Sequence, residues 1–300
     1  MIASREPTMI PRLPLHPPRP SRRFGRVAWL LACLLALSGL VHAATPETIL
    51  RQAPWKNKEV GRGVTWRQCH LADLFGSPQN LNLLDADLKT SGVLVRIPYL
   101  AGGAQRTTSR LARETGGVAA AVNGNFFDRS GKLGSVQFLK VNQRIISRTQ
   151  PHTLDQGALT IGADERVRIR LRPEGGWESL TLRDVMASNI PLLVRGNSFA
   201  FPNTPYYQSQ RHPRTAVGLT AGNHLLLLTV DGRSPTAAGM SLVELRRTMR
   251  ILGCRDALNM DGGGSTTMWI RVEPGGGVVN QPSDDRERPV VDVIAVLAPR

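Results

Sequence analysis

The chain has 300 residues, of which 41% are hydrophobic and 5% aromatic, so it can bury the core of one large domain or two small ones. Its formal net charge of +15 at pH 7 favours anionic partners. Nucleic acid is disfavoured among these, because no stretch interleaves aromatic residues with Lys and Arg as a base-stacking surface does.

The first 43 residues have the pattern of a secretory leader. Residues 21–26 are basic, residues 27–41 form an apolar run of 15, and a small-residue site for cleavage follows. The run is shorter than the roughly 20 residues that cross a bilayer as a helix, which favours a leader over a retained anchor. We therefore expect an exported protein, periplasmic or secreted, with no stable membrane span after cleavage. Removing residues 1–43 leaves 32 basic and 22 acidic residues, a formal charge of +10.

Residues 44–90 show no clear hydrophobic period and form an N-terminal region of uncertain structure. Residues 92–99 then predict a strand, residues 107–115 a short helix, and residues 119–122 a buried strand. That strand leads directly into the polar sequence 123–128.

Residues 135–172 alternate apolar and polar positions over several short runs, which predicts a series of strands. Residues 181–187 predict a short helix. Residues 214–220 and 225–230 flank a polar turn and predict a hairpin. Because residues 225–230 are apolar on both faces, we expect a central strand there.

The clearest predicted helix begins after Ser241. Ser241 and Glu244 form a capping-box pattern, in which each side chain satisfies a free backbone N–H at the helix start. Gly253 ends the helix. The apolar residues at helical spacing are Leu242, Leu245, Met249 and Leu252.

Three further strands are predicted, at residues 257–260, 266–272 and 290–297, and the first two flank a glycine-rich turn. No linker divides the residues after the leader. We therefore expect one α+β domain with a mixed, mainly antiparallel β-sheet and a few packed helices.

Two cysteines, Cys69 and Cys254, follow the leader, and the sequence allows either a disulfide between them or two buried free thiols. The histidines are scattered, without the spacing of a zinc site. We predict no metal and no cofactor, although the Asp, Asn and glycine-rich carbonyl oxygens of the later motifs suit a divalent cation such as calcium.

Four polar clusters stand at the ends of predicted strands, at residues 123–128, 212–215, 231–233 and 259–266. In these clusters the sequence resembles the phosphodiester glycosidase family, over about residues 90–298. The matching pieces, in family order, are VNGNFFD, RHPRTAVGL, LLLLTVDGR, GMSLVELRRTMRILGCRDALNMDGGGSTTM and RPVVDVIAVL.

The resemblance implies a glycosidase, a hydrolase that cleaves the glycosidic bond of a sugar-1-phosphodiester, with residues 91–300 as its catalytic domain. The partner it implies is a phosphorylated glycan carrying an N-acetylglucosamine-type sugar, in the envelope or outside the cell. The chain departs from the family pattern at Asn125, where a second glycine is usual. Since Asn tolerates a positive φ well, we expect the loop to keep its shape.

In that chemistry the phosphate is the leaving group, and Arg214 and Arg233 are candidates for binding it, because a guanidinium matches phosphate oxygens with paired hydrogen bonds. The sugar carbon becomes positively charged in the transition state, so a carboxylate must attack it or deprotonate a water. Asp261 and Asp231 are the catalytic candidates.

Further side chains and backbone groups are candidates for substrate binding. Glycines in the turn can present backbone N–H groups to an anion, the hydroxyls after them add donors, and asparagines can read sugar hydroxyls or an acetamide. The candidates are Asn123, Asn259, Gly262, Gly263, Ser265 and Thr266.

Each motif also has a structural interpretation: DGGGS alone is a common hairpin turn, Asp231-Gly232 an ordinary turn, and Arg214 a surface charge. Two other functions stay open. One is a phosphodiesterase that cleaves the P–O bond, although no two-metal ligand set is recognisable. The other is a non-catalytic binder of an anionic glycan, which the two Asp candidates disfavour.

Overall fold

The structure is a computed structural model that describes residues 44–201, 205–271 and 276–300. The predicted leader, residues 1–43, lies outside the described residues. Within the ranges described, no helix is long and apolar enough to cross a membrane.

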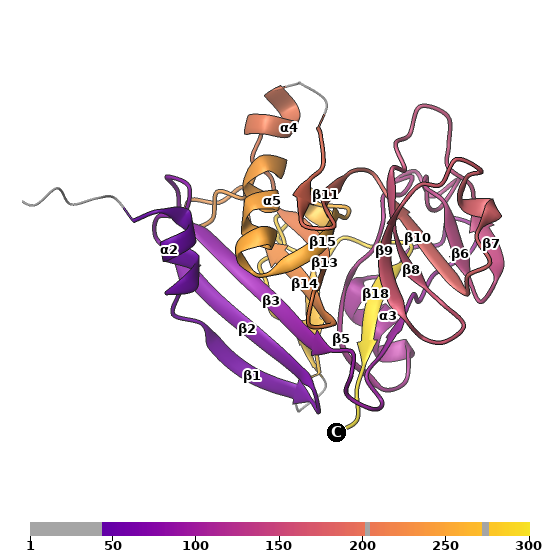
Figure 1. The fold of residues 1–300 in the computed structure, drawn as a ribbon, viewed down its shortest axis with the longest axis horizontal. Helices are drawn as coiled ribbons and strands as arrows, with labels where there is room; N and C mark the ends of the chain where they lie inside the picture. Colours follow the sequence, from indigo (N-terminus) through magenta and orange to yellow (C-terminus); the bar gives the residue numbers. More distant parts are fainter. Residues whose placement is uncertain (1–43, 202–204, 272–275) are drawn as a thin grey trace, which may run out of the picture. The chain divides into compact units, whose positions relative to one another are not determined.

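The largest sheet has eight strands in the order β1-β2-β3-β14-β13-β15-β11-β12 (Figure 1), and all its pairs are antiparallel. Three of its strands come from residues 44–90, where the sequence showed no elements, and these residues belong to the same compact unit as the rest of the described chain. The strands are β1 (Lys56–Gly61), β2 (Val64–Leu71), β3 (Gln79–Asp87), β11 (Pro191–Val194), β12 (Asn197–Ser198), β13 (Arg214–Thr220), β14 (His224–Val230) and β15 (Cys254–Asn259).

Strand β14 lies in the middle of this sheet, between β3 and β13, and the predicted hairpin with β13 is confirmed. Its leucines alternate between two cores. Leu225 and Leu227 pack on one face of the sheet, and Leu226 and Leu228 pack on the other. This two-sided burial is why the strand is apolar at consecutive positions.

Two five-stranded antiparallel sheets complete the strand structure, in the orders β7-β6-β10-β8-β9 and β17-β16-β5-β18-β4. The core on the side of Leu225 and Leu227 is shared between these sheets and the eight-stranded sheet. Their strands are β4 (Leu94–Arg96), β5 (Val118–Asn123), β6 (Leu139–Val141), β7 (Arg144–Ser147), β8 (Gly157–Ile161), β9 (Val167–Leu171), β10 (Asp184–Ser188), β16 (Met268–Ile270), β17 (Gly277–Val278) and β18 (Val293–Leu297).

The helix predicted at residues 181–187 is wrong, because residues 184–188 form β10, with β6 and β8 on either side. Val185, Met186 and Ala187 are all fully buried. A helix on a protein surface buries one stripe of its residues, whereas a central strand buries consecutive residues on opposite faces.

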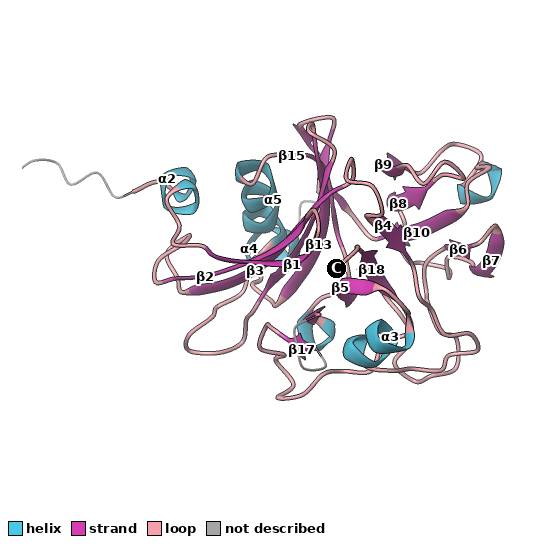
Figure 2. Ribbon diagram, turned by 90° about the horizontal axis from the view of Figure 1, so that it is seen from below, coloured by secondary structure: helices cyan, strands magenta, loops and turns pink. Residues whose placement is uncertain are grey.

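Helices cover the other face of the eight-stranded sheet (Figure 2), where α2 and α5 pack against its second core. The predicted capping box between Ser241 and Glu244 starts α5, and Gly253 follows its end at φ 93°. The predicted helix at residues 107–115 is confirmed as α3, which packs on β5 and β16. The helices are α2 (Pro46–Arg51), α3 (Thr108–Glu114), α4 (Pro205–Ser209) and α5 (Leu242–Ile251), with short 3-10 turns at Trp177–Ser179 and Gly263–Ser265.

The glycine-rich segment after β15 is not a hairpin turn. It carries the chain from the eight-stranded sheet to β16, which pairs with β5 in another sheet. The predicted strand at residues 266–272 is shorter in the structure, and Val272 lies outside the described residues. The predicted α+β fold is confirmed, and every strand pair described is antiparallel.

Candidate active site

Three of the four polar clusters meet at one edge of the eight-stranded sheet. Arg214 begins β13 and pairs with Val230, the last residue of β14, so Asp231 follows at the same edge. Asn259 ends β15 opposite Ala216 of β13. Because β13 is antiparallel to both β14 and β15, the start of β13 lies beside the ends of β14 and β15.

Asn123, at the end of β5, brings the fourth cluster to this edge. Its Oδ1 accepts hydrogen bonds from the Thr215 hydroxyl (2.7 Å) and the Thr267 N–H (3.2 Å), and its Nδ2 donates to the carbonyl of Asp261 (2.7 Å). We predicted that Asn123 reads sugar hydroxyls. These bonds join strand β13, the segment before β16 and Asp261, so Asn123 positions Asp261, and its contact with sugar hydroxyls stays a prediction.

Asp261 lies in the segment between β15 and the glycine turn. Its N–H donates to the Gly124 carbonyl (3.2 Å), and its Oδ1 accepts from the Gly262 N–H (2.9 Å). Burial raises the pKa of Asp261 to about 6, although the Ser265 hydroxyl and the Gly262 N–H act to lower it. The carboxyl group therefore titrates close to neutrality.

Asp231 is 4% exposed, and its Oδ1 accepts hydrogen bonds from Asn280 Nδ2 (3.2 Å) and the Gln281 N–H (3.0 Å). Burial raises its pKa to about 6, against the lowering effect of these two bonds. Asn280 also donates to the carbonyl of Thr266 (3.0 Å), so it links Asp231 to the glycine turn.

A third carboxyl group, Asp292, was not among the predicted site residues. It is 1% exposed, its Oδ1 accepts from the Asn125 N–H (2.9 Å), and its Oδ2 has no partner among the described residues. Burial, and after it the nearby charge of Asp261, raises the pKa of Asp292 to about 8. The signal that could have found it is an acidic residue inside an otherwise apolar predicted strand, 290–297, since a buried carboxyl group is rare without a partner.

Gly124 packs so closely against Asp292 that the position has no room for a side chain. A Cβ there would lie 2.0 Å from Asp292 Oδ1. The next residue, Asn125, does not have a positive φ, so our reason for its tolerance in place of glycine does not apply. Its side chain is buried, with Nδ2 donating to the Ala187 carbonyl (3.2 Å) and Oδ1 accepting from Ser135 (2.9 Å).

Arg214 is a buried cation rather than a surface charge, with 6% of its surface exposed. Its Nε donates to the carbonyl of Met240 (2.8 Å) and its Nη2 to that of Gln210 (3.1 Å), and it forms no ion pair within the described ranges. The acidic residue that acts on it, Glu244, pairs with Arg211 instead. Burial lowers the pKa of Arg214 to about 10, which leaves it protonated at neutral pH. A buried guanidinium without a carboxylate is a strong candidate for binding an anion.

His212 and Arg233 lie beside Arg214. Arg233 is exposed, has a positive φ of 63°, and its Nη2 lies 3.5 Å from His212 Nδ1. Burial and then the charges of Arg214 and Arg233 lower the pKa of His212, which favours its neutral form. We had not included His212 in the site, although it stands in the same cluster as Arg214.

In the glycine turn, the N–H groups of Gly262 and Gly263, which were predicted to meet an anion, bond within the protein. The N–H of Gly262 bonds to Asp261, and the N–H of Gly263 donates to the carbonyl of Pro213 (2.9 Å). The N–H groups of Ser265 and Thr266 close the turn on the carbonyls of Gly262 and Gly263. Gly263 has a φ of 60°, and a Cβ there would lie 3.0 Å from Arg233 Nη2. Because Gly263 has no side chain, Arg233 can lie close to the turn. The positive charge at the site therefore comes from the side chains of Arg214 and Arg233.

Several buried polar atoms at this edge have no hydrogen-bond partner within the part of the chain that the structure describes. A native interior leaves few such atoms, and a cluster of them indicates a place that a polar ligand or water completes. They are His212 Nε2, Asn259 Oδ1, Thr266 Oγ1, Thr267 Oγ1 and Asp292 Oδ2.

A cavity of about 400 Å³ is lined by Arg129, Arg286 and Arg288, among other residues, and Arg288 also contacts the glycine turn. Arg288 pairs with Asp284 (2.7 Å), and its Nη1 lies 3.4 Å from Ser265 Oγ. Arg129 and Arg288 both act to lower the pKa of Asp261. The residues after β17 thus add positive charge that the sequence analysis missed.

Elsewhere, Cys69 and Cys254 are free and buried, and burial raises the pKa of each thiol to about 12. Among residues 44–201, 205–271 and 276–300, no group of three His, Cys, Asp or Glu side chains could hold a metal ion.

The fold and this edge define an antiparallel α+β protein in which buried carboxyl groups and a buried arginine stand at the same end of one sheet. A family model for phosphodiester glycosidases matches residues 116–297, and the chain belongs to that family. Glycosidase-type hydrolysis is the activity that the name of this family describes. The resemblance noted in the sequence is thereby confirmed.

The individual proteins that resemble this chain have low sequence identity to it or match only a short part of it. The SPbeta prophage-derived protein YomE of Bacillus subtilis (strain 168) is 35% identical over 89 residues, which cover 30% of this chain and 13% of YomE. The catalytic domain of zebrafish N-acetylglucosamine-1-phosphodiester alpha-N-acetylglucosaminidase is 16% identical, with a TM-score of 0.64 over 86% of this chain and 94% of that one. A hypothetical protein from Synechocystis is also 16% identical, with a TM-score of 0.65 over 82% and 64% of the two chains. Both structures show the shared fold.

Proposed function

We propose that the protein hydrolyses the glycosidic bond of a sugar-1-phosphodiester, and that the sugar is of the N-acetylglucosamine type on an envelope or extracellular glycan. The observation that carries this proposal is the buried, unpaired guanidinium of Arg214 at the sheet edge that also holds Asp231 and Asp261. A phosphodiester supplies the anion that Arg214 lacks, and its sugar carbon is the centre on which a carboxylate acts.

In the proposed reaction, Arg214 and Arg233 bind the phosphate oxygens and stabilise the charge that develops there. The bond between the anomeric carbon and the phosphate oxygen breaks, and its electron pair leaves with the phosphate. Asp261 either attacks the anomeric carbon, forming a glycosyl ester that water then hydrolyses, or takes a proton from a water that attacks this carbon directly. In both routes the oxygen of the water becomes the new sugar hydroxyl. Asp292, protonated at neutral pH, adds no second negative charge beside Asp261.

The variant Asp261→Asn tests this assignment. We expect at least about a 100-fold fall in kcat for release of free sugar from a GlcNAc-1-phosphodiester such as UDP-GlcNAc, because the carboxylate that acts on carbon or water is lost. The matched control is Asp73→Asn, a change at an exposed aspartate, which should leave kcat unchanged. Normal turnover by Asp261→Asn with an unchanged melting temperature would remove Asp261 from the mechanism.

We propose further that the protein acts outside the cytoplasm, on the basis of the basic and then apolar pattern of residues 21–41. N-terminal sequencing of the protein recovered from culture medium or periplasm should begin near residue 44. Full-length protein recovered only from the cytoplasm would contradict export.

A further inference from the structure

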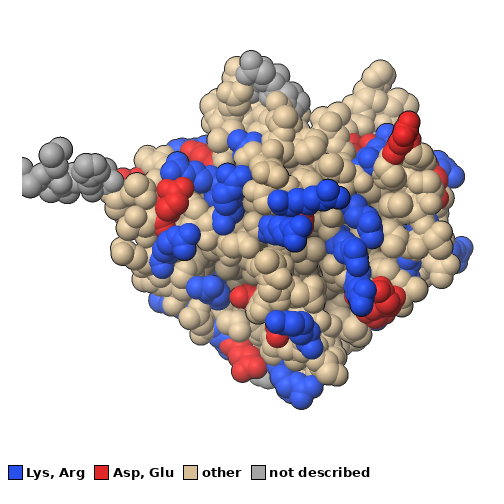
Figure 3. Space-filling view, viewed as in Figure 1, with Lys and Arg blue, Asp and Glu red and all other residues tan. Residues whose placement is uncertain are grey.

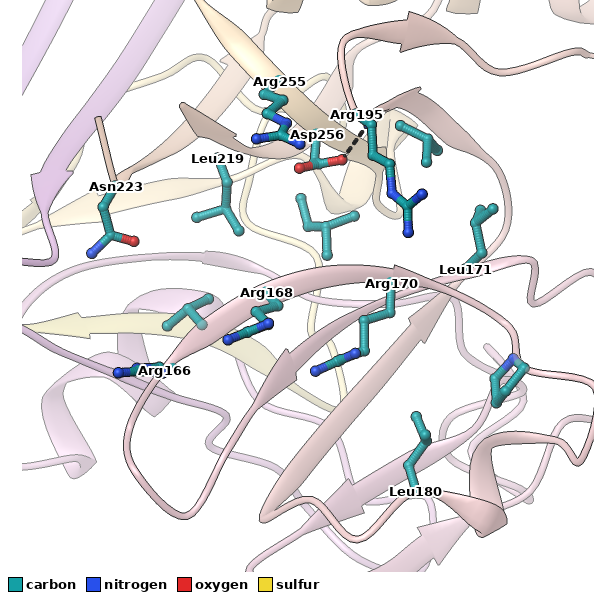
Figure 4. Close-up of a pocket in the computed structure, with 14 residues that line it drawn as sticks. Arg166, Arg168, Arg170, Leu171, Leu180, Arg195, Leu219, Asn223, Arg255 and Asp256 are labelled. Carbon is teal, nitrogen blue, oxygen red and sulfur yellow. Dashed lines mark hydrogen bonds between the residues drawn. The ribbon is translucent and has the colours of Figure 1, made fainter. Parts of the chain in front are cut away.

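A second concave surface lies at the opposite end of the strands that carry the site. It is a hollow of about 890 Å³ between β9 and the ends of β11, β13 and β15 (Figure 4). Arg255 and Asp256 stand near the start of β15, whereas Asp261 follows its end. Six residues of extended strand span about 20 Å, so this hollow is separate from the candidate active site.

The hollow is strongly basic, and we call it the arginine groove. One acidic side chain, Asp256, also lines it, and its Oδ1 accepts a hydrogen bond from the backbone N–H of Arg195 (2.7 Å). On the face drawn in Figure 3, Lys and Arg atoms gather in a band over β9 and the neighbouring ends of the eight-stranded sheet. The arginines that line the groove are Arg166, Arg168, Arg170, Arg195 and Arg255.

Four of these guanidinium groups have no hydrogen bond or ion pair within the described ranges, and Arg166 has only a contact of 3.4 Å to Asp164. The Nε of Arg170 is buried without a partner. Other arginines of this region are paired: Arg96 and Arg183 both contact Glu165. Like charges gathered without counter-charges repel one another, and an anionic ligand removes that cost.

The arrangement of the charges fits a linear ligand. Arg168 and Arg170 alternate along β9, the outer strand of its sheet, and Arg166 directly precedes this strand, so the three project on one side about 6.6 Å apart. Figure 4 shows Arg195 and Arg255 across from them, on the eight-stranded sheet. Apolar side chains, including Ile169 and Leu219, also line the groove.

We infer that the arginine groove binds a linear polymer of sugar or polyol units joined by phosphodiesters, as a site separate from the one that cleaves. Its cations are all arginines, and the planar guanidinium matches phosphate oxygens with paired hydrogen bonds. No aromatic residue lines the groove, so it lacks the stacking surface with which proteins hold single-stranded nucleic acid. This binding goes beyond the proposed hydrolysis, because it holds the protein on an anionic polymer.

Fluorescence anisotropy with labelled poly(ribitol phosphate) tests the inference. This probe has no glycosidic phosphodiester, so its binding is measured without cleavage. We expect saturable binding that weakens with added salt, and at least about a tenfold loss of affinity in Arg168→Glu. The matched control is Arg144→Glu, a reversal at an exposed arginine on β7, the opposite outer strand of the same sheet, and it should change affinity less than about twofold.

Two further readouts separate the possible results. Arg168→Glu should hydrolyse a small sugar-1-phosphodiester with the kcat of the wild type, so failure of the proposed hydrolysis leaves the binding result intact. Arg168→Gln, which keeps a polar side chain, should show an intermediate affinity and an unchanged melting temperature. Equal losses in the Arg168 and Arg144 variants, no saturable binding, or tighter Arg168-dependent binding of single-stranded DNA would each overturn the inference.

Discussion

At the residue scale, Asp292 is buried, and its Oδ2 has no hydrogen-bond partner among the described residues. Its protonation therefore affects the stability of the fold. A carboxyl group with a pKa of about 8 in the folded protein and about 4 when unfolded binds its proton more tightly when folded. The free energy of unfolding therefore falls as pH rises from about 4 to 8.

The variant Asp292→Asn should remove the part of this dependence that Asp292 contributes, while Asp231 and Asp261 keep theirs. Asn keeps the acceptor that bonds to the Asn125 N–H and carries no charge. We expect the variant to match the wild type near pH 4 and to exceed it by at least about 2 kcal/mol near pH 8, measured by urea unfolding. Asp73→Asn serves as the control with no such gain. A wild-type stability that stays level over this range would show that Asp292 is not held protonated.

The raised pKa of Asp261 predicts a pH dependence of activity. A carboxylate that attacks carbon or takes a proton from water must be ionised, and Asp261 ionises around pH 6. The value of kcat/KM should therefore rise about tenfold between pH 5 and pH 7. A flat profile over that interval, with the protein still folded, argues against an Asp261 carboxylate in the rate-determining step.

At the scale of elements, the turn after β5 depends on the absence of a side chain at Gly124. A methyl group there would collide with Asp292, so Gly124→Ala should displace the turn that bonds to Asp261. We expect at least about a 100-fold loss of kcat and a stability loss of about 1–3 kcal/mol. The control is Gly116→Ala, where nothing lies within 4 Å and φ is not positive, and it should leave both unchanged. Full activity in Gly124→Ala would mean that the turn can move without harm to the site.

The elements that could be predicted from the sequence are those whose signals are local. The alternating leucines of β14 and the capping box of α5 carry their signals locally, and both predictions are confirmed. Strand β1 is at a sheet edge with four of its six residues exposed, so it has no clear alternation. The segment that forms β10 has the residues of a short helix, and its conformation is decided by β6 and β8, which lie far away in the sequence.

The site was predictable in part for a related reason. Arg214, Asp231 and Asp261 stand at the ends of apolar runs, and strand ends at one sheet edge lie close together. Asp292 approaches Asn125 because β18 pairs with β5. These strands are far apart in the sequence, and no local sequence pattern predicts that they pair. Asn123 acts as a positioning residue because it bonds to Thr215, Thr267 and Asp261, which are all distant from it in the sequence.

At the scale of the whole molecule, positive charge surrounds both the site and the arginine groove, within a chain whose net charge is +15. Such a field raises the encounter rate with an anionic substrate and is screened by salt. We expect kcat/KM for a small sugar-1-phosphodiester to fall several-fold between low salt and about 0.5 M salt, while kcat changes little. An uncharged glycoside of the same sugar is the control, and an equal salt effect on it would exclude electrostatic steering.

The measurement that tests the central claim most directly follows the oxygen of water into the products. A GlcNAc-1-phosphodiester is hydrolysed in ¹⁸O-enriched water, and the sugar and phosphate products are separated. Mass spectrometry then measures the ¹⁸O content of each product. If Asp261 directs attack at the anomeric carbon, the label enters the sugar hydroxyl and the phosphate stays unlabelled. Label in the phosphate would mean that the P–O bond breaks, and it would contradict the glycosidase mechanism proposed for this site.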